Sequence, residues 1–234
     1  ATGNGSTKVG KTAAVQISAT SSTNTTINST SGNISITGTN ASSIRADYAA
    51  GIWIGGAFHG DGSSFNGDVS IETGAGSISL TANVSDTNVS TGWRHGIVLI
   101  TRYANENVTV KTNSGNITFD ATANYQSNTS DQSAFQIQTV GSSSDIKVIS
   151  QTGDITIIAE MLSTQEDDGQ YENGIRITAA NDTDNIMIGY DGTNAYSGDI
   201  IFRSNSIQQR NVNAGSGSIS VRTSGSLTFE PKDG

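Results

Sequence analysis

The chain has 234 residues, of which 33% are hydrophobic and 14% are charged, and its formal net charge is −9. This apolar content is too low for a thick globular core, and the charge is too low for a typical disordered chain, so we expect a long body with a thin core. The negative net charge argues against a nucleic-acid partner. The absence of cysteine excludes disulfides and thiolate metal sites. No apolar stretch is long enough for membrane insertion.

The predicted elements are short strands in which apolar and polar residues alternate, as in a strand with one buried face. Three strand types, c, a and b, recur in that order with a period of about 38 to 45 residues, which indicates a repeat architecture. In chain order they are centred on Val15–Ile17 (c), Thr25–Ile27 (a), Ile34–Ile36 (b), Ile52–Ile54 (c), Val69–Ile71 (a), Ile78–Leu80 (b), Ile97–Leu99 (c), Val108–Val110 (a), Ile117–Phe119 (b), Phe135–Ile137 (c), Ile146–Val148 (a), Ile155–Ile157 (b), Ile175–Ile177 (c), Ile186–Ile188 (a), Ile200–Phe202 (b), Ile207 (c), Ile219–Val221 (a) and Leu227–Phe229 (b).

Each strand type resembles its own copies more than it resembles the other two types. If each strand stacks on the copies of its own type, the chain is all-β and forms three parallel sheets around an apolar shaft. This arrangement is a parallel β-helix of about six coils of 27–45 residues. A marker glycine precedes each b strand, at Gly32, Gly76, Gly115, Gly153, Gly198 and Gly225. We expect a tight corner there, which needs either a positive φ or the absence of a side chain.

Polar stretches between b and c predict loop excursions at about 37–51, 81–96, 120–134 and 158–174, stacked as a ridge on one corner. The fifth coil lacks such an excursion, and two further loops are expected at 55–68 and 189–197. Because the repeat begins with a c strand and stops after a b strand, residues 1–234 are interpreted as a single β-helix segment of a longer solenoid chain, whose remainder is an expected partner.

The excursions supply the candidate ligand-binding residues. Aromatic residues near their ends suit sugars or protein partners if they point outward, whereas the alternative is that they fold back over the corner. The candidates are Tyr48, Trp93, Arg94 and Tyr171, together with Phe58 and His59 in the loop 55–68. Asn-x-Ser/Thr triplets give candidate glycosylation sites at Asn40, Asn83, Asn88 and Asn128, although turn-forming Asn beside strand-forming Ser or Thr also explains them.

Residues for catalysis or metal binding are not indicated. Asp154 and Asp199 occupy a corner position that other coils fill with Asn or Ser, so we expect them to bond turn backbone rather than to act as paired acids. Both histidines, His59 and His95, are expected to be exposed in loops. Asp-Gly pairs such as Asp191-Gly192 are interpreted as turns rather than calcium ligands, and no cofactor is expected.

Four b strands with their corners resemble the repeats of filamentous-haemagglutinin-type adhesins: Ser31–Ile36 (SGNISI), Ser114–Phe119 (SGNITF), Thr152–Ile157 (TGDITI) and Ser224–Phe229 (SGSLTF). That resemblance implies a right-handed shaft, secreted or held on a bacterial cell surface, with a host or cell-surface glycan or protein as its partner. The leading hypothesis is therefore a non-enzymatic extracellular adhesin or surface-filament segment. The alternatives are a carbohydrate-active β-helix enzyme, either a polysaccharide lyase or a glycosidase, and a purely structural stalk.

Overall fold

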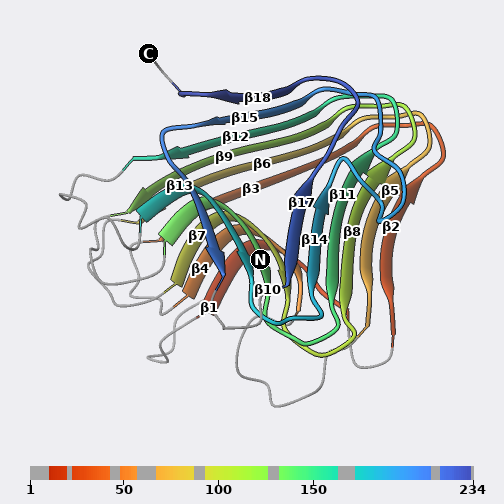
Figure 1. Cartoon of the computed structure of the whole chain (residues 1–234). Helices are drawn as coiled ribbons and strands as arrows, with labels where there is room; N and C mark the ends of the chain where they lie inside the picture. The colour runs from red at the N-terminus through yellow and green to blue at the C-terminus, as the bar shows by residue number, and fades with distance from the viewer. Residues whose placement is uncertain are drawn as a thin grey trace.

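The chain folds into a right-handed parallel β-helix (Figure 1). Its three parallel sheets are those that the repeat predicts. The computed structural model describes residues 11–19, 23–42, 48–56, 67–86, 93–125, 132–162, 172–211 and 217–232. These residues form 18 strands in three parallel six-stranded sheets, and each coil contributes one strand to each sheet. Within the described ranges there is no helix that could span a membrane.

The three sheets contain the three predicted strand types and keep their letters here. Sheet c comprises β1 (Lys11–Ile17), β4 (Tyr48–Gly55), β7 (Trp93–Thr101), β10 (Gln132–Thr139), β13 (Glu172–Ala179) and β16 (Ile207–Asn211). Sheet a comprises β2 (Thr25–Ser29), β5 (Val69–Thr73), β8 (Asn107–Thr112), β11 (Asp145–Ser150), β14 (Asn185–Ile188) and β17 (Ser218–Val221). Sheet b comprises β3 (Ile34–Ser42), β6 (Ile78–Asp86), β9 (Ile117–Tyr125), β12 (Ile155–Met161), β15 (Ile200–Ser204) and β18 (Leu227–Glu230).

The core is a narrow shaft filled by ladders of equivalent apolar residues. Ile117 of β9 pairs in register with Ile155 of β12, which pairs with Ile200 of β15. Aromatic residues join two sheets across the shaft, where the ring centroids of Phe119 and Phe135 are 4.9 Å apart. Side chains that alternate in and out on sheets a and b therefore bury one face of each strand, which is the pattern that the period of two predicts.

Five of the six marker glycines are required because successive coils approach too closely for a side chain, the exception being Gly32 in the first coil. None of them has a positive φ. A Cβ on Gly115 would lie 2.0 Å from the carbonyl oxygen of Gly76, and one on Gly153 would lie 2.3 Å from that of Gly115. A buried hydroxyl completes the corner: Thr112 Oγ1 donates to Gly76 O at 2.9 Å and accepts from Gly115 N at 3.0 Å. Of the two explanations for these glycines, the absence of a side chain is the correct one.

The predicted excursions are too long, because sheet b continues into them. Strand β3 reaches Ser42 and β4 already begins at Tyr48, inside the range expected to be a loop, and β6, β9 and β12 extend in the same way. The added half of each strand faces sheet c with small residues, since a Cβ on Gly51 would lie only 2.8 Å from Ala82 Cβ. Glycine and alanine fill this narrow space, and they do not produce an apolar pattern that reveals a strand.

Sheet c is buried on both faces along its four middle strands, β4, β7, β10 and β13, unlike sheets a and b. Its outer face carries a second apolar cluster of Ala50, Trp53, Val98 and Ile100. The run Ile97–Ile100 is continuously apolar, as expected for a strand covered on both sides. Sheet c is therefore the covered side of the helix, while the outer faces of sheets a and b carry the half-exposed and exposed polar residues.

The fifth coil is shorter than the four before it between its b strand and its c strand, as the sequence predicts. Only Asn205 and Ser206 separate β15 from β16, which confirms that the fifth coil has no excursion. The final coil exposes Ile207, Leu227 and Phe229, and the ring of Phe229 stacks on that of Phe202 at 5.2 Å.

Candidate functional site

Of the aromatic residues singled out from the sequence, Trp93 alone has a side chain that the structure describes, and this side chain packs against a neighbouring cation. Tyr48 and Trp93 are register partners on β4 and β7. Trp93 is half-buried, and the guanidinium carbon of Arg102 lies 5.7 Å from its ring centroid and 5.7 Å from that of Trp53. Tyr171, Phe58 and His59 lie outside the described residues, as do Asn88 and Asn128.

Arg94 and His95 are not at the surface. Arg94 is fully buried on β7, so its expected place on an exposed ridge is wrong. His95 is buried beside it and its Nδ1 is 2.8 Å from Ser133 Oγ; burial, with Arg176 nearby, lowers the pKa of His95 to about 3. Both errors have one cause: sheet c has no exposed outer face on these strands.

The two remaining glycosylation candidates differ in access. Asn40 is half-buried and its Nδ2 donates to Ala50 O at 3.2 Å. Asn83 is exposed on β6. Modification at these positions stays a prediction, with Asn83 the more accessible acceptor.

The corner carboxylates bond backbone, as the sequence pattern predicts. Asp154 Oδ1 accepts from Asp199 N at 2.9 Å, and Asp199 Oδ1 accepts from Ser226 N at 2.7 Å. Asn33 and Asn116 accept from the next coil at the same position. The position therefore joins successive coils, which explains why Asn, Ser and Asp all occur there.

One hollow with convergent polar groups lies on the outer face of sheet a, beside the loop 189–197. We call it the loop groove, and its cavity volume is about 440 Å³. Three neighbouring strands contribute to its lining, with Asp145 and Lys147 on β11, Asn185 and Met187 on β14, and Ser218 and Ser220 on β17, which Arg222 directly follows. Tyr190, Asp191 and Gly192 of the loop also line it.

The loop is held by its own hydrogen bonds. Asp191 Oδ1 accepts from Thr193 N at 2.8 Å and Asn194 N at 2.7 Å, and Tyr196 donates its hydroxyl to Asp191 Oδ2 at 2.6 Å. The bonds from the Asn194 and Thr193 backbone and from Tyr196 hold the pKa of Asp191 well below its usual range, and the Asp191 carboxylate raises the pKa of Tyr196. Asp191 is therefore ionised at neutral pH and forms the turn that the sequence predicts.

An aromatic–cation pair stands at one end of the groove. The guanidinium carbon of Arg222 lies 4.5 Å from the ring centroid of Tyr190, and both side chains line the cavity. Such a contact fixes two long side chains against each other in the free protein. The groove thus presents a preformed surface that is partly apolar and rich in hydrogen-bonding groups.

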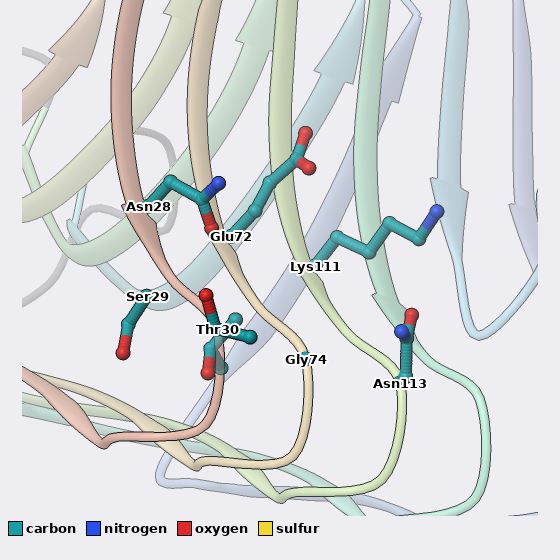
Figure 2. A pocket seen from close by; sticks show the side chains of 8 residues that line it. Asn28, Ser29, Thr30, Glu72, Gly74, Lys111 and Asn113 are labelled. Carbon is teal, nitrogen blue, oxygen red and sulfur yellow. The ribbon is translucent and has the colours of Figure 1, made fainter.

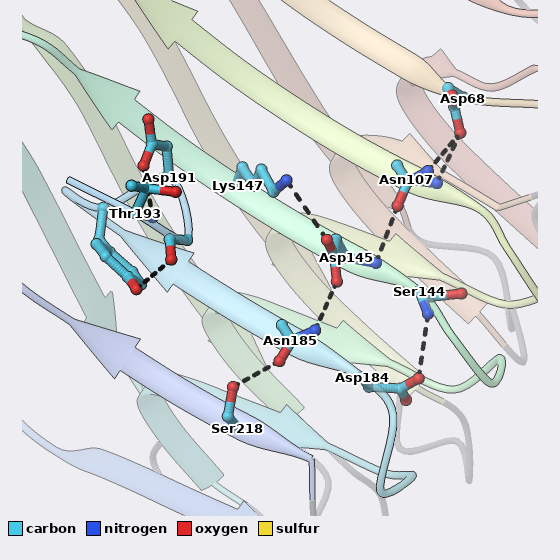
Figure 3. Close-up of polar contacts among 12 residues, drawn as sticks. Asp68, Asn107, Ser144, Asp145, Lys147, Asp184, Asn185, Asp191, Thr193 and Ser218 are labelled. Carbon is cyan, nitrogen blue, oxygen red and sulfur yellow. Dashed lines mark hydrogen bonds and ion pairs between the residues drawn. The ribbon is translucent and has the colours of Figure 1, made fainter.

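A row of polar side chains crosses the neighbouring strands (Figure 3). Asn107 donates through its backbone N and its Nδ2 to Asp68 Oδ1, both at 3.0 Å. Asn185 Nδ2 donates to Asp145 Oδ1 at 2.9 Å, and Ser218 Oγ donates to Asn185 Oδ1 at 2.7 Å. The other oxygen of Asp145 is 3.4 Å from Lys147 Nζ. These bonds orient the polar groups that face the loop groove.

A second, smaller hollow lies at the other end of sheet a, and we call it the corner groove (Figure 2). Its volume is about 290 Å³. Asn28, Glu72 and Lys111 line it from β2, β5 and β8, and they are register partners on adjacent strands. Ser29 and Thr73 at the ends of β2 and β5, with Thr30, Gly74 and Asn113 of the following corner, complete its lining. The described residues contain no group of three His, Cys, Asp or Glu side chains suited to a metal ion.

The family model of the domain described as Toastrack DUF4097 matches residues 6–158, which is more than half of the chain. The chain belongs to the Toastrack DUF4097 family. This finding corrects the resemblance to filamentous-haemagglutinin-type adhesins. The Gly-x-Ile-x-Ile motif that suggested them is a consequence of corner geometry, since any coil packed this closely on the next needs a glycine there. No curated protein and no solved structure matches the Toastrack chain significantly.

The residues of the two grooves are not evident from the sequence. The sequence predicts Asp191 as a turn residue, but Asp145 and Lys147 on β11 and Arg222 just after β17 belong to no distinguishing motif. The usable signal is the aromatic content of the insertion 189–197 next to a polar outer face. Only the register of the strands shows which outward residues lie under that loop.

Proposed function

We propose that this Toastrack chain is a non-enzymatic binding module, a rigid β-helix that presents the loop groove to a carbohydrate. The Tyr190–Arg222 pair carries this proposal, because it gives a partly apolar wall beside amide, hydroxyl and carboxylate groups from three successive coils. Sugars combine apolar ring faces with many hydroxyls and match such a surface. The bonded loop also favours binding, since little conformational entropy is lost on association.

A glycan array followed by calorimetry tests the proposal. We expect a specific glycan to bind the wild type, and Tyr190→Ala to weaken binding by at least about tenfold, the equivalent of 1.4 kcal/mol. Tyr190→Phe keeps the ring and should retain most of the affinity. Arg203→Gln on the outer face of sheet b serves as the surface-charge control. Absence of binding to any glycan would leave the structural stalk as the better description.

A carbohydrate-active enzyme is the second candidate, favoured by one observation. Asp145, Asp191, Lys147 and Arg222 meet in the loop groove, which places carboxylates and basic groups from adjacent coils in one hollow. The binding role is preferred because the turn occupies both oxygens of Asp191. Polysaccharide-cleavage assays on the same samples separate the two: turnover that Asp145→Asn abolishes would replace the binding proposal with an enzymatic one.

Adhesion and a location outside the cell belong to the same proposal. Cell fractionation with antibody against this chain tests the location, and we expect the chain in the surface or secreted fraction. Recovery solely from the soluble cell interior would overturn that part of the proposal.

A further inference from the structure

The two grooves lie on one face and are joined by a row of register partners that are all polar except the buried Met187. Thr26, Ser70, Thr109, Lys147, Met187 and Ser220 are register partners on the six successive strands of sheet a and point to its outer face. The corner groove borders this row on β2, β5 and β8, and the loop groove contains its members on β11, β14 and β17. A ligand leaving one groove along the row therefore enters the other.

We propose that the grooves are two subsites of one track that binds a linear, neutral, β-1,4-linked polysaccharide along the helix axis. This inference rests on the proposed carbohydrate-binding function and names the ligand class and its direction. The strands of a parallel sheet are about 4.8 Å apart, so the outermost strands of sheet a are separated by about 24 Å. An extended β-1,4-linked chain advances by a similar length per sugar, so successive sugars meet successive coils.

Charge balance indicates that the ligand is neutral. In the loop groove Asp145 and Asp191 are balanced by Lys147 and Arg222, and in the corner groove Glu72 is balanced by Lys111. The chain as a whole has a net charge of −9, which opposes a polyanionic ligand. Apart from Met187 and the ring of Tyr190, the remaining side-chain groups on the track are amides and hydroxyls, which donate to and accept from sugar hydroxyls equally well.

The arrangement of the two subsites predicts a dependence on ligand length. A short oligosaccharide fills the loop groove alone, where the Tyr190–Arg222 pair supplies the apolar contact. A longer one also reaches Glu72 and Lys111, and the second contact forms at high effective concentration because both subsites belong to one rigid sheet. Figure 2 shows the carboxylate of Glu72 and the ammonium group of Lys111 pointing outward from adjacent strands, which leaves both available to a ligand.

Calorimetry with the dimers and hexamers of the β-1,4-linked glucose and N-acetylglucosamine series tests the track. We expect the hexamer of one series to bind at least about tenfold tighter than its dimer. The double variant Glu72→Gln with Lys111→Ala should remove this gain and leave dimer affinity within about twofold, whereas Tyr190→Ala weakens both ligands. Thr118→Ala on the outer face of sheet b is the control. In backbone NMR spectra, the Lys111 amide signal should shift with the hexamer but not with the dimer.

The outcomes separate the inference from the proposed function. Equal affinity for dimer and hexamer, with dimer binding still dependent on Tyr190, overturns the track and leaves the carbohydrate module standing. If the Glu72/Lys111 double variant still binds the hexamer more tightly than the dimer by the same factor, the assignment of the second subsite is wrong. If neither series binds, the neutral β-1,4-linked ligand class is wrong, and the glycan array alone then decides the proposed function.

Discussion

The glycine ladder makes a quantitative prediction for Gly115→Ala. The new Cβ would lie 2.0 Å from Gly76 O and 2.4 Å from Gly76 C, both backbone atoms that no side-chain rotation can move away. Ordinary contact begins at about 3.4 Å, so the two coils must separate by more than about 1 Å. That shift lengthens the hydroxyl bridge through Thr112, which now joins Gly76 O and Gly115 N at 2.9 and 3.0 Å.

The cost of this substitution adds two contributions. Overpacking of this kind costs about 1–3 kcal/mol, and two weakened hydrogen bonds cost about 1 kcal/mol each. We therefore expect Gly115→Ala to lower the free energy of unfolding by about 3–5 kcal/mol, a large share of the roughly 5–15 kcal/mol of a typical domain. In urea denaturation followed by far-UV circular dichroism, the midpoint should fall by about 2 M at an m-value of about 2 kcal/mol/M.

Gly32→Ala is the matched control for this experiment. Gly32 occupies the same corner in the first coil, and its Cβ would meet only Ser29 Oγ, at 3.1 Å. We expect a change within about 1 kcal/mol, because the Ser29 side chain can rotate away, losing only its hydrogen bond from Gly32 N at 3.0 Å, and alanine also restricts the unfolded chain. If Gly32→Ala were as costly as Gly115→Ala, or if Gly115→Ala were neutral, the explanation by close coil approach would be wrong.

Three further predictions concern single side chains. Thr112→Val keeps the shape of the side chain but removes the hydroxyl that bonds two buried backbone groups. We therefore expect the free energy of unfolding, measured in urea, to fall by about 2–4 kcal/mol. The control Thr109→Val, on the outer face of the same strand, should lower it by less than about 0.5 kcal/mol. Burial raises the pKa of Glu106 to about 7 from 4.5, so the folded state binds this proton more tightly than the unfolded chain does. Wild-type stability should therefore decrease as the pH rises from about 4.5 to about 7 and then level off, and Glu106→Gln should flatten that slope; an unchanged slope would contradict the assignment. Glu230→Gln removes the partner of Arg203, 2.7 Å away, but both side chains are about 40% exposed, so thermal unfolding should report a loss below about 1 kcal/mol.

The strands and their stacking order were predictable because both depend on local pattern. Apolar residues two apart define each inner face, and the marker glycines fix where the chain turns, so Ile117, Ile155 and Ile200 could be aligned without a structure. The ends of the b strands were not predictable, because their second halves use Gly38, Ala82 and similar small residues that carry no strand pattern.

The candidate site depended on contacts that the sequence does not encode locally. The burial of Arg94 follows from the covered outer face of sheet c, for which the continuous apolar run Ile97–Ile100 was an overlooked signal. The loop groove requires residues from β11, β14, β17 and the loop 189–197 to converge. Their convergence follows from strand register and from how the loop folds around Asp191, and neither is visible from strand alternation alone.

The corner contacts also affect how such a chain can change during evolution. The corner hydroxyls of Thr73, Thr112 and Ser150 each bond the glycine of their own coil and the glycine carbonyl of the coil before it. The register offset between coils varies from 27 residues at Ile200–Leu227 to 45 at Ile155–Ile200. An in-frame duplication of one coil, such as the 38 residues between Ile117 and Ile155, reproduces every one of these corner contacts. Shaft length can therefore grow or shrink by recombination between repeats, and the loops that connect the strands can diverge independently of it.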